Sequence, residues 1–448
     1  MSKTVKIRKG ANINLKGSAE KKTTEAVLSE TFAIKPTDFH GMVPKMLVKV
    51  GDEVKAGTPL FYDKSNDRIK FVSPVSGEVA EIVRGAKRRI LEVRVLADKT
   101  QKLIEGSPID ISGMEAAQVC DVLMDGGLWP FIKRRPYDII ANPTEAPKSI
   151  FVSGFDSAPL GADIAYLLDG RETDFQNGIN ALAKMTAGKV HVNALASDSS
   201  FISKTKNAQV NTFSGPHPAG TVGVQIHHID PIAKGDVVWT VDPQAVAMIG
   251  RYLNTGKADF SKTIALVGSE VNEPQYLKVI SGTNMKPILG GRIADGDTRI
   301  ICGNVLSGLQ VSADGYLGFF NNVVSVIPEG RDSQFIGWIA PNFHKFSLSH
   351  SYFSWLMPGK KYNLNTNTNG EGRAFVMSGQ YEDVLPMDVY PVHLLKAIMT
   401  NDLDKMEGLG IYEVAPEDLA LCEFACTSKT DVQSWVRKGL DMAMEELG

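Results

Sequence analysis

Long apolar runs, cysteine and excess charge are all scarce in this sequence. No stretch approaches the roughly 18 consecutive apolar residues of a membrane-spanning helix, so we expect no span. Four cysteines in 448 residues suit a reducing compartment better than a disulfide framework. The formal net charge is −3, with basic and acidic residues interspersed. This balance argues against a nucleic-acid-binding protein, whose phosphate contacts need a basic face.

Glycine and proline, by contrast, are plentiful. The chain has 41 Gly and 22 Pro, which predicts many turns between short elements. Apolar residues make up 43% and charged residues 22%, as in an ordinary globular protein. Because 448 residues exceed what one hydrophobic core organises, we expect two to four domains.

Residues 1–100 are predicted to be all-β, because short alternating runs are separated by Gly and Pro turns. Within them, GDEVKAGTPL and SPVSGEV are typical of a biotinyl/lipoyl-like β-sandwich. Carrier proteins of that kind bear a modified lysine at a hairpin tip, and Lys64 lies near such a tip. Its spacing to Pro74 is longer than expected of a lipoyl hairpin, so an unmodified scaffold is the preferred interpretation.

Residues 101–255 alternate apolar strands with helical patterns, which predicts a Rossmann-like α/β domain with a mostly parallel sheet. Residues 148–152 and 189–192 are expected to be strands, as are 220–226 and 237–241. Residues just past a buried strand are where open α/β sheets bind small molecules. The stretch SGFDSAPLGAD (153–163) therefore marks a candidate ligand site.

Three further regions complete the predicted organisation. Residues 256–335 are expected to form a β-grasp-like (SLBB-like) module, and residues 381–448 a helical domain. Residues 336–380 connect them and are rich in aromatic residues and Asn. The part from 341 to 362 combines aromatic residues with lysines, which suggests a protein contact, with burial inside the chain as the alternative.

Four stretches together resemble one family. They are residues 48–83, the block around SGFDSAPLGAD, HPAGTVGVQIHHIDPIAKGDVVWTV (217–241) and residues 384–426. In motif and order they are similar to the A subunits of the Na⁺-translocating NADH:quinone oxidoreductase. More distantly they resemble the Rnf complex C subunit and the flavin-carrying subunit of respiratory complex I. In those distant relatives a Gly-rich turn and an acidic strand end hold FMN and NADH.

Compared with those relatives, the flavin site of this chain is degenerate. Gly126 and Gly127 are fewer glycines than the relatives have, and bulky Leu128 and Trp129 follow them. Of the acidic strand end only Asp156 is left. Because a backbone that approaches a phosphate needs small residues, we expect no tight binding of FMN or NADH.

A quinone headgroup is a looser ligand that the same region still suits. Trp129 and Phe131 offer aromatic faces, and Lys133 and Arg134 could donate hydrogen bonds to carbonyl oxygens. These residues, with Gly126, Gly127 and Asp156, are therefore the candidates for cofactor binding.

The carboxyl-terminal region resembles an iron–sulfur domain that has lost ligands. Only Cys422 and Cys426 are present where the relatives have four thiolates, and no nearby His completes a zinc set. Two buried thiols are expected instead of a metal. No serine has a nucleophile-elbow context, so no catalytic residue is assigned.

The resemblance implies a peripheral subunit on the cytoplasmic side of the bacterial inner membrane, in a six-subunit complex that moves electrons from NADH to quinone and exports Na⁺. Flavins and iron–sulfur centres would lie on other subunits, and quinone binding by this chain is left open. The alternative is a free-standing flavin- or nucleotide-binding oxidoreductase that uses residues 126–157. A carrier protein modified at Lys64 is a third hypothesis.

Overall fold

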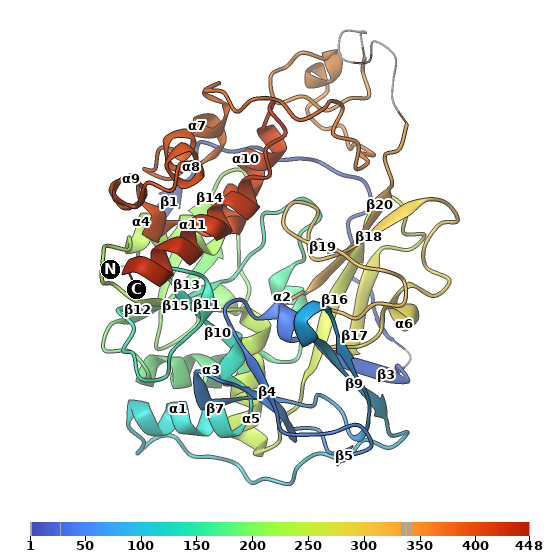
Figure 1. Cartoon of the computed structure of the whole chain (residues 1–448), viewed down its shortest axis with the longest axis vertical. Helices are drawn as coiled ribbons and strands as arrows, with labels where there is room; N and C mark the ends of the chain where they lie inside the picture. Colours follow the sequence, from blue (N-terminus) through green and yellow to red (C-terminus); the bar gives the residue numbers. More distant parts are fainter. Residues whose placement is uncertain (1, 27, 333–336, 338–341, 448) are drawn as a thin grey trace.

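The computed structural model describes residues 2–26, 28–332, 337 and 342–447. Its strands form four sheets, of seven, six, four and three strands. Figure 1 shows them as separate regions of the chain with the carboxyl-terminal helices on one side. Within the described residues, no helix is both long and apolar enough to cross a membrane.

The two smaller sheets form the β-module that the sequence predicts. The four-stranded sheet has the order β3 (Thr31–Ile34), β9 (Ile90–Ala97), β8 (Gly77–Arg84), β5 (Glu53–Val54). The three-stranded sheet has the order β4 (Pro44–Met46), β6 (Pro59–Asp63), β7 (Asn66–Val72). Short 3-10 helices η1 (Pro36–Asp38) and η2 (Ala86–Arg88) flank them. Phe61 and Phe71 stack in the core, with ring centroids 4.7 Å apart.

The seven-stranded sheet belongs to an α/β layer. Its order is β1 (Thr4–Lys6), β14 (Gln209–Ser214), β13 (Lys189–Leu195), β12 (Ser149–Ser153), β15 (Val238–Val241), β10 (Ile132–Arg135), β11 (Ile139–Ile140). The first five strands run parallel, whereas β10 is antiparallel to both its neighbours. Strands β12 and β13 are buried along most of their length, which agrees with protein covering both faces of this sheet.

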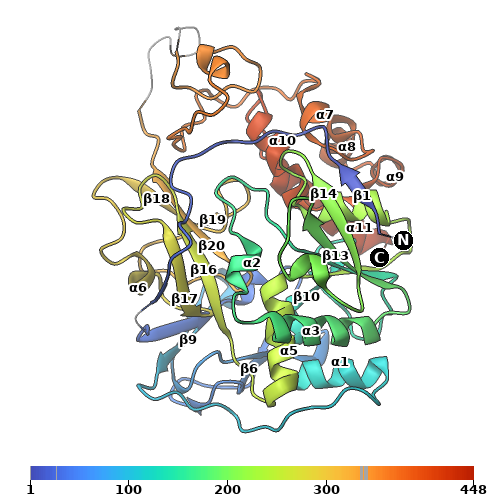
Figure 2. The same ribbon diagram turned by 180° about the vertical axis from the view of Figure 1, so that it is seen from behind.

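Seven helical segments accompany this sheet. They are α1 (Ala116–Asp125), η3 (Trp129–Phe131), α2 (Ile164–Leu167), α3 (Glu172–Lys184), η4 (Ile202–Lys204), α4 (Val222–Ile229) and α5 (Pro243–Thr255). Both views place α1, α3 and α5 together beside the sheet (Figures 1 and 2). Helices α3 and α5 pack closely, since a Cβ at Gly178 would lie 2.0 Å from the carbonyl oxygen of Val246.

One predicted strand of this layer is wrong. Residues 220–226 were expected to be extended, but Val222–Ile229 forms α4. Val222, Val224 and Ile226 recur at every second position, which is the period of a strand, yet Gly223, Val224, Gln225 and Ile226 are all buried in the helix. A short run of this kind fits a buried helix as well as a strand. Tertiary burial therefore decided the conformation.

The six-stranded sheet follows in the chain. Its order is β19 (Leu309–Gln310), β18 (Thr298–Cys302), β20 (Val323–Pro328), β16 (Ser261–Val267), β17 (Gln275–Ile280), β2 (Thr23–Glu25), with α6 (Met285–Leu289) beside it. It has a hydrophobic core of its own, which includes Ile264, Leu277 and Val324. This agrees with the short strands expected for residues 256–335.

The carboxyl-terminal part is helical. It comprises η5 (Phe353–Leu356), α7 (Gln380–Val384), α8 (Pro391–Met399), α9 (Leu403–Gly408), η6 (Ile411–Glu413), η7 (Pro416–Leu419), α10 (Ala420–Ala425) and α11 (Val432–Leu447). Its contact with the α/β layer is ionic as well as apolar. Arg135 of β10 lies 3.1 Å from Asp418 and 2.7 Å from Glu417, and His227 lies 2.7 Å from Glu413.

The amino-terminal segment connects three of these regions. Strand β1 pairs in parallel with β14, Leu15 bridges to Tyr362, and β2 pairs in parallel with β17. Figure 2 shows the segment crossing the molecule between β1 and the six-stranded sheet. The sequence grouped these residues with the β-module, whereas their hydrogen bonds are made with other sheets.

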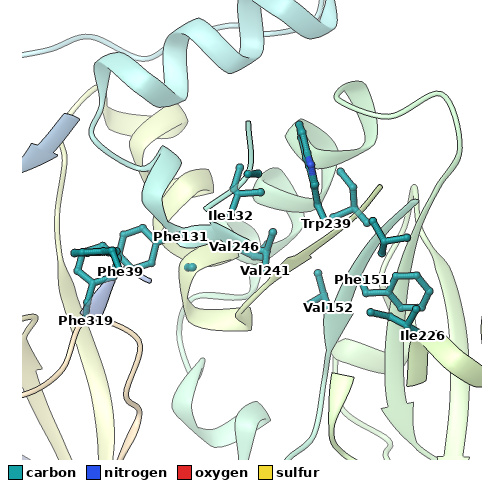
Figure 3. Packing of buried hydrophobic residues seen from close by; sticks show 14 of the residues in the cluster. Phe39, Phe131, Ile132, Phe151, Val152, Ile226, Trp239, Val241, Val246 and Phe319 are labelled. Atoms are coloured by element: carbon teal, nitrogen blue, oxygen red, sulfur yellow. The ribbon is translucent and has the colours of Figure 1, made fainter. Parts of the chain in front are cut away.

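Three phenylalanines join the regions at the centre of the molecule. Phe39 comes from the β-module, Phe131 from the α/β layer and Phe319 from the six-stranded sheet (Figure 3). The ring centroids of Phe131 and Phe319 are 4.2 Å apart, and those of Phe39 and Phe319 are 4.8 Å apart. Offset and edge-on contacts of this kind hold packed aromatic rings in place. A cavity lies directly beside this junction, and Phe131 is among the residues that line it.

Candidate functional site

A cavity of about 540 Å³ lies where the regions meet. The ends of β12 and β15 form one wall, and the turns around β18 and β20 form another. Thr37 and Asp38 come from the β-module, and Glu417 and Gln433 from the carboxyl-terminal helices. The carboxyl ends of parallel strands are the usual ligand-binding edge of an open α/β sheet. The volume lies within the range of small-molecule sites.

Two loops of the α/β layer interlock at the cavity floor. The Ser157 hydroxyl accepts a hydrogen bond from the N–H of Gly220 (2.8 Å) and contacts Nδ1 of His217 at 3.0 Å. A Cβ at Gly220 would lie 2.5 Å from the backbone nitrogen of Ser157, so the close approach needs glycine. Burial lowers the pKa of His217 to about 4, so its ring is neutral at physiological pH.

Hydrogen bonds between regions tie the cavity walls together. The side-chain amide of Asn322 donates to Asp242 at 2.9 Å, which links the six-stranded sheet to the start of α5. The N–H of Phe319 donates to Asp38 at 2.8 Å, which links the same sheet to the β-module. The shape of the cavity thus depends on three regions holding their relative positions.

Partly buried carboxyl groups dominate the electrostatics of the cavity. Burial raises the pKa of Asp156 to about 6, and it also raises the pKa values of Asp38 and Asp242. Burial opposes the ionisation of Asp138, but the cations of Lys133 and Arg135 outweigh it and lower its pKa to about 2. The cavity is therefore a poor site for a highly charged anion such as a dinucleotide pyrophosphate.

Of the two predicted hydrogen-bond donors, Lys133 and Arg134, Lys133 lines the cavity. Its ammonium lies 3.5 Å from Asp138 and 4.5 Å from the ring centroid of Phe320. Phe131 and Asp156, also predicted, line the same cavity, and Phe155 and Phe320 add apolar surface. An aromatic wall beside a cation with a partly exposed side chain suits a flat ligand with a carbonyl oxygen.

The glycine turn is not at the cavity. The N–H of Gly126 donates to the carbonyl of Val122 (3.0 Å) and that of Gly127 to Met124 (3.1 Å), so both amides complete α1. A Cβ at Gly127 would lie 2.5 Å from Val72, and one at Gly126 would lie 2.6 Å from the Tyr252 ring. These glycines admit neighbouring side chains, and their amides cannot receive a phosphate without breaking helix bonds.

Trp129 and Arg134 also lie away from the cavity. Trp129 is fully buried; its indole N–H donates to the carbonyl of Ala141 at 2.7 Å, and its ring meets Trp239 edge-on. Arg134 pairs with Glu145 at 2.6 Å. Both side chains were predicted as candidate ligand contacts, but in the structure they have structural roles. For Arg134, alternation along β10 explains the difference from Lys133, because neighbours on a strand point to opposite faces.

Several residues that line the cavity belong to no motif identified in the sequence. Asp38, Asn304 and Glu417 come from segments far apart in the chain, which only the fold brings together. Asp242 offered a local signal, since it follows β15 directly and precedes Pro243. It caps α5, with its carboxylate accepting from the N–H of Gln244 at 2.9 Å.

The predicted thiols and the predicted hairpin lysine lie elsewhere. Cys422 and Cys426 are buried, and the N–H of Thr430 donates to the sulfur of Cys426 at 3.3 Å. The described residues contain no group of three or more His, Cys, Asp or Glu side chains arranged to hold a metal. Lys64 is exposed in the turn between β6 and β7, as expected of a hairpin tip.

Fold and site define a class of protein: a mixed α/β protein with a cavity of small-molecule size at the carboxyl edge of a parallel sheet. Comparison with known families identifies the family within this class. Residues 5–98 match the family described as the NqrA N-terminal barrel-sandwich hybrid domain, residues 114–258 the NqrA second alpha/beta domain, and residues 263–313 the NQRA C-terminal domain.

Curated relatives match over nearly the whole chain. The A subunit of the Na(+)-translocating NADH-quinone reductase from Hahella chejuensis is 35% identical over 445 residues, covering 99% of this chain and 100% of the relative. Its counterpart from Neisseria meningitidis serogroup B is 36% identical over 446 residues, with the same coverage. The chain therefore belongs to the family of A subunits of the Na⁺-translocating NADH-quinone reductase.

Solved structures give only slight likenesses. An NAD⁺-reducing [NiFe]-hydrogenase in the H₂-reduced state matches with a TM-score of 0.39 and 9% identity, over 74% of this chain and 61% of that chain. The air-oxidised state gives a TM-score of 0.36 and 10% identity, over 50% and 49%. Scores this low carry no argument about fold or function.

Proposed function

We propose that this chain, as the A subunit of a Na⁺-translocating NADH-quinone reductase, receives a quinone headgroup in its central cavity. Family membership makes the chain part of such a multi-subunit oxidoreductase complex. The proposal also places it peripherally, on the cytoplasmic side of a bacterial inner membrane, in a six-subunit assembly. NADH, flavins and iron–sulfur centres would be bound by the other subunits.

The position of Lys133 carries the quinone proposal. A quinone is flat, apolar and uncharged, with two carbonyl oxygens as its acceptors. Lys133 can donate to one of them from beside the ring of Phe320, while Phe131 and Phe155 supply apolar wall. The raised pKa of Asp156, about 6, suits proton exchange with a reduced quinone oxygen near neutral pH.

A free-standing flavin enzyme is not favoured. The turn that would cradle the flavin phosphate has its amides bonded within α1, and carboxyl groups surround the cavity. A flavin enzyme of this kind would release flavin when the purified chain is denatured. We expect a colourless chain that co-purifies with membrane subunits.

A matched pair of variants on β10 tests the quinone proposal. Lys133→Met removes the donor at the cavity, whereas Arg134→Met removes the neighbouring cation, which faces away from the cavity toward Glu145. With a photoreactive quinone analogue on the full chain, we expect saturable labelling of wild type. Lys133→Met should weaken it on the order of tenfold, as expected for a hydrogen bond from a charged group.

Arg134→Met should leave the labelling intact. Circular dichroism and thermal melting would show that both variants are folded. Wild type and both variants giving the same non-saturating signal would rule out a quinone site in this cavity. Membership of the complex would stand regardless, since it rests on the relatives.

A further inference from the structure

An exposed apolar segment without acidic residues lies at one end of the molecule. It is formed by residues 342–362, which we call the aromatic loop. Its exposed members include Phe343 (51%), Phe353 (47%), Trp355 (51%) and Leu356 (57%). In Figure 1 it lies in the orange part at the end of the long axis. Large apolar side chains gathered on one exposed segment mark an interaction surface.

The loop is anchored at its base. Tyr362 is buried; its N–H donates to the carbonyl of Asn14 (2.7 Å), and its carbonyl accepts from the N–H of Lys16 (2.9 Å). The hydroxyl of Tyr362 donates to the carbonyl of Ser354, within η5, at 3.4 Å. These bonds join the loop to the amino-terminal segment. The aromatic side chains are thus presented outward from a fixed base.

The charged side chains of this segment have one sign. From residue 333 to residue 370 the sequence contains no Asp or Glu, but it contains Lys345, Lys360 and Lys361. Lys360 donates to the carbonyl of Phe343, and Lys361 is exposed. Lys345 lies 5.6 Å from the ring centroid of Tyr352. Cations therefore border the aromatic rings without counter-charges from the same segment.

We propose that the aromatic loop binds the surface of an anionic lipid bilayer. Trp and Phe prefer the boundary between headgroups and acyl chains, and Lys is attracted to anionic headgroups. A protein partner fits less well, because Lys is depleted from protein–protein interfaces even where aromatic residues are enriched. This inference goes beyond the proposed function, since it depends on neither quinone nor the other subunits.

Vesicle binding by the full chain tests the proposal. We expect sedimentation with vesicles of phosphatidylcholine that contain phosphatidylglycerol, little with phosphatidylcholine alone, and weakening by salt. Each lysine near an anionic surface contributes about fivefold, so Lys360→Gln with Lys361→Gln should reduce partitioning on the order of 25-fold. Trp355→Ser should also reduce it and remove the blue shift of tryptophan fluorescence.

Leu309→Ala is the matched control, because Leu309 is 73% exposed and belongs to β19. It should bind vesicles as wild type does, and unchanged melting temperatures would show that all variants are folded. The proposal is overturned if the full chain ignores anionic vesicles, or if the loop variants bind them as well as wild type does. Loss of co-purifying subunits with vesicle binding unchanged would instead assign the loop to a protein contact.

Discussion

At the scale of single residues, the stability of this chain depends on charged side chains that are buried. Arg135 is 2% exposed and is surrounded by Asp138, Glu417 and the fully buried Asp418. Burial raises the pKa of Asp418 to about 6, although Arg135 opposes the shift. Desolvating such a group is costly unless its partner stays in place. The contact between β10 and the carboxyl-terminal helices therefore depends on a complete pair.

Removing the cation should be far worse than removing the pair. Arg135→Met leaves the Asp418 carboxylate buried without its partner, and we expect a loss of about 3–5 kcal/mol of unfolding free energy. Arg135→Met combined with Asp418→Asn should recover much of that loss. Urea unfolding at pH 7.5 measures both. A single variant that loses less than the double variant would contradict this account of the pair.

His191 should make stability depend on pH. It stacks on Phe151 at 4.6 Å, and burial lowers its pKa to about 4. Because the unfolded chain takes up this proton near pH 6.5, the folded state loses stability as pH falls from 6.5 toward 4. The stability lost by His191→Gln relative to wild type should therefore shrink by about 2 kcal/mol between pH 7.5 and pH 5.

The comparison must be differential, because other groups act in the opposite direction. Burial raises the pKa of Asp156 to about 6, above its unfolded value, so its protonation stabilises the fold as pH falls below 6. Subtracting the unfolding curves of wild type and His191→Gln removes this contribution. A difference that stays constant between pH 7.5 and pH 5 would show that His191 does not carry the linkage.

At the scale of elements, periodicity predicted most of the structure and failed for one short buried segment. Strands β12 and β13 and helices α8 and α11 agree with the sequence pattern, because each has one clear period or clear turn residues at its ends. Helix α4 was predicted as a strand, and its branched residues Val222, Val224 and Ile226 do recur at every second position, as they would in a strand. Over so few residues, pattern alone could not separate a buried helix from a strand.

Close packing of α3 against α5 gives a prediction at this scale. A Cβ at Gly250 would lie 1.8 Å from the carbonyl oxygen of Asp174, so Gly250→Ala forces the helices apart. We expect a loss of roughly 1–3 kcal/mol of unfolding free energy. Gly408→Ala, at the end of α9 with no atom within 4 Å, is the control and should be neutral or stabilising.

Both variants replace a helical glycine and so share the gain in helix propensity. Their difference in chemical unfolding therefore reports the packing of α3 on α5. Equal unfolding midpoints for the two variants would show that the helices separate without cost.

At the scale of the whole molecule, the cavity is formed by residues from several regions of the chain. Lys133, Phe131 and Asp156 were recognisable from motif and strand ends, whereas Asp38 and Glu417 reach the cavity only through the packing of distant regions. Trp129 was predicted as a ligand contact, but its sequence neighbourhood does not show where its side chain packs. In the structure its indole N–H donates to the backbone carbonyl of Ala141 in the core. Sequence motifs identified the edge of the sheet, and the tertiary structure decided which side chains face the cavity.

The amino-terminal segment should couple regions that are distant in sequence. It pairs with β14, bridges Tyr362 at the base of the aromatic loop, and adds β2 to the edge of β17. Deleting residues 2–25 should therefore reduce amide hydrogen-exchange protection at all three places, because each loses backbone partners. Strand β8, which pairs with β5 and β9 inside the β-module, is the internal control and should stay protected.

A shorter deletion, of residues 2–8, removes only β1 and should affect β14 alone. Protection lost at β14 alone in both deletions would show that the regions are held together without this segment.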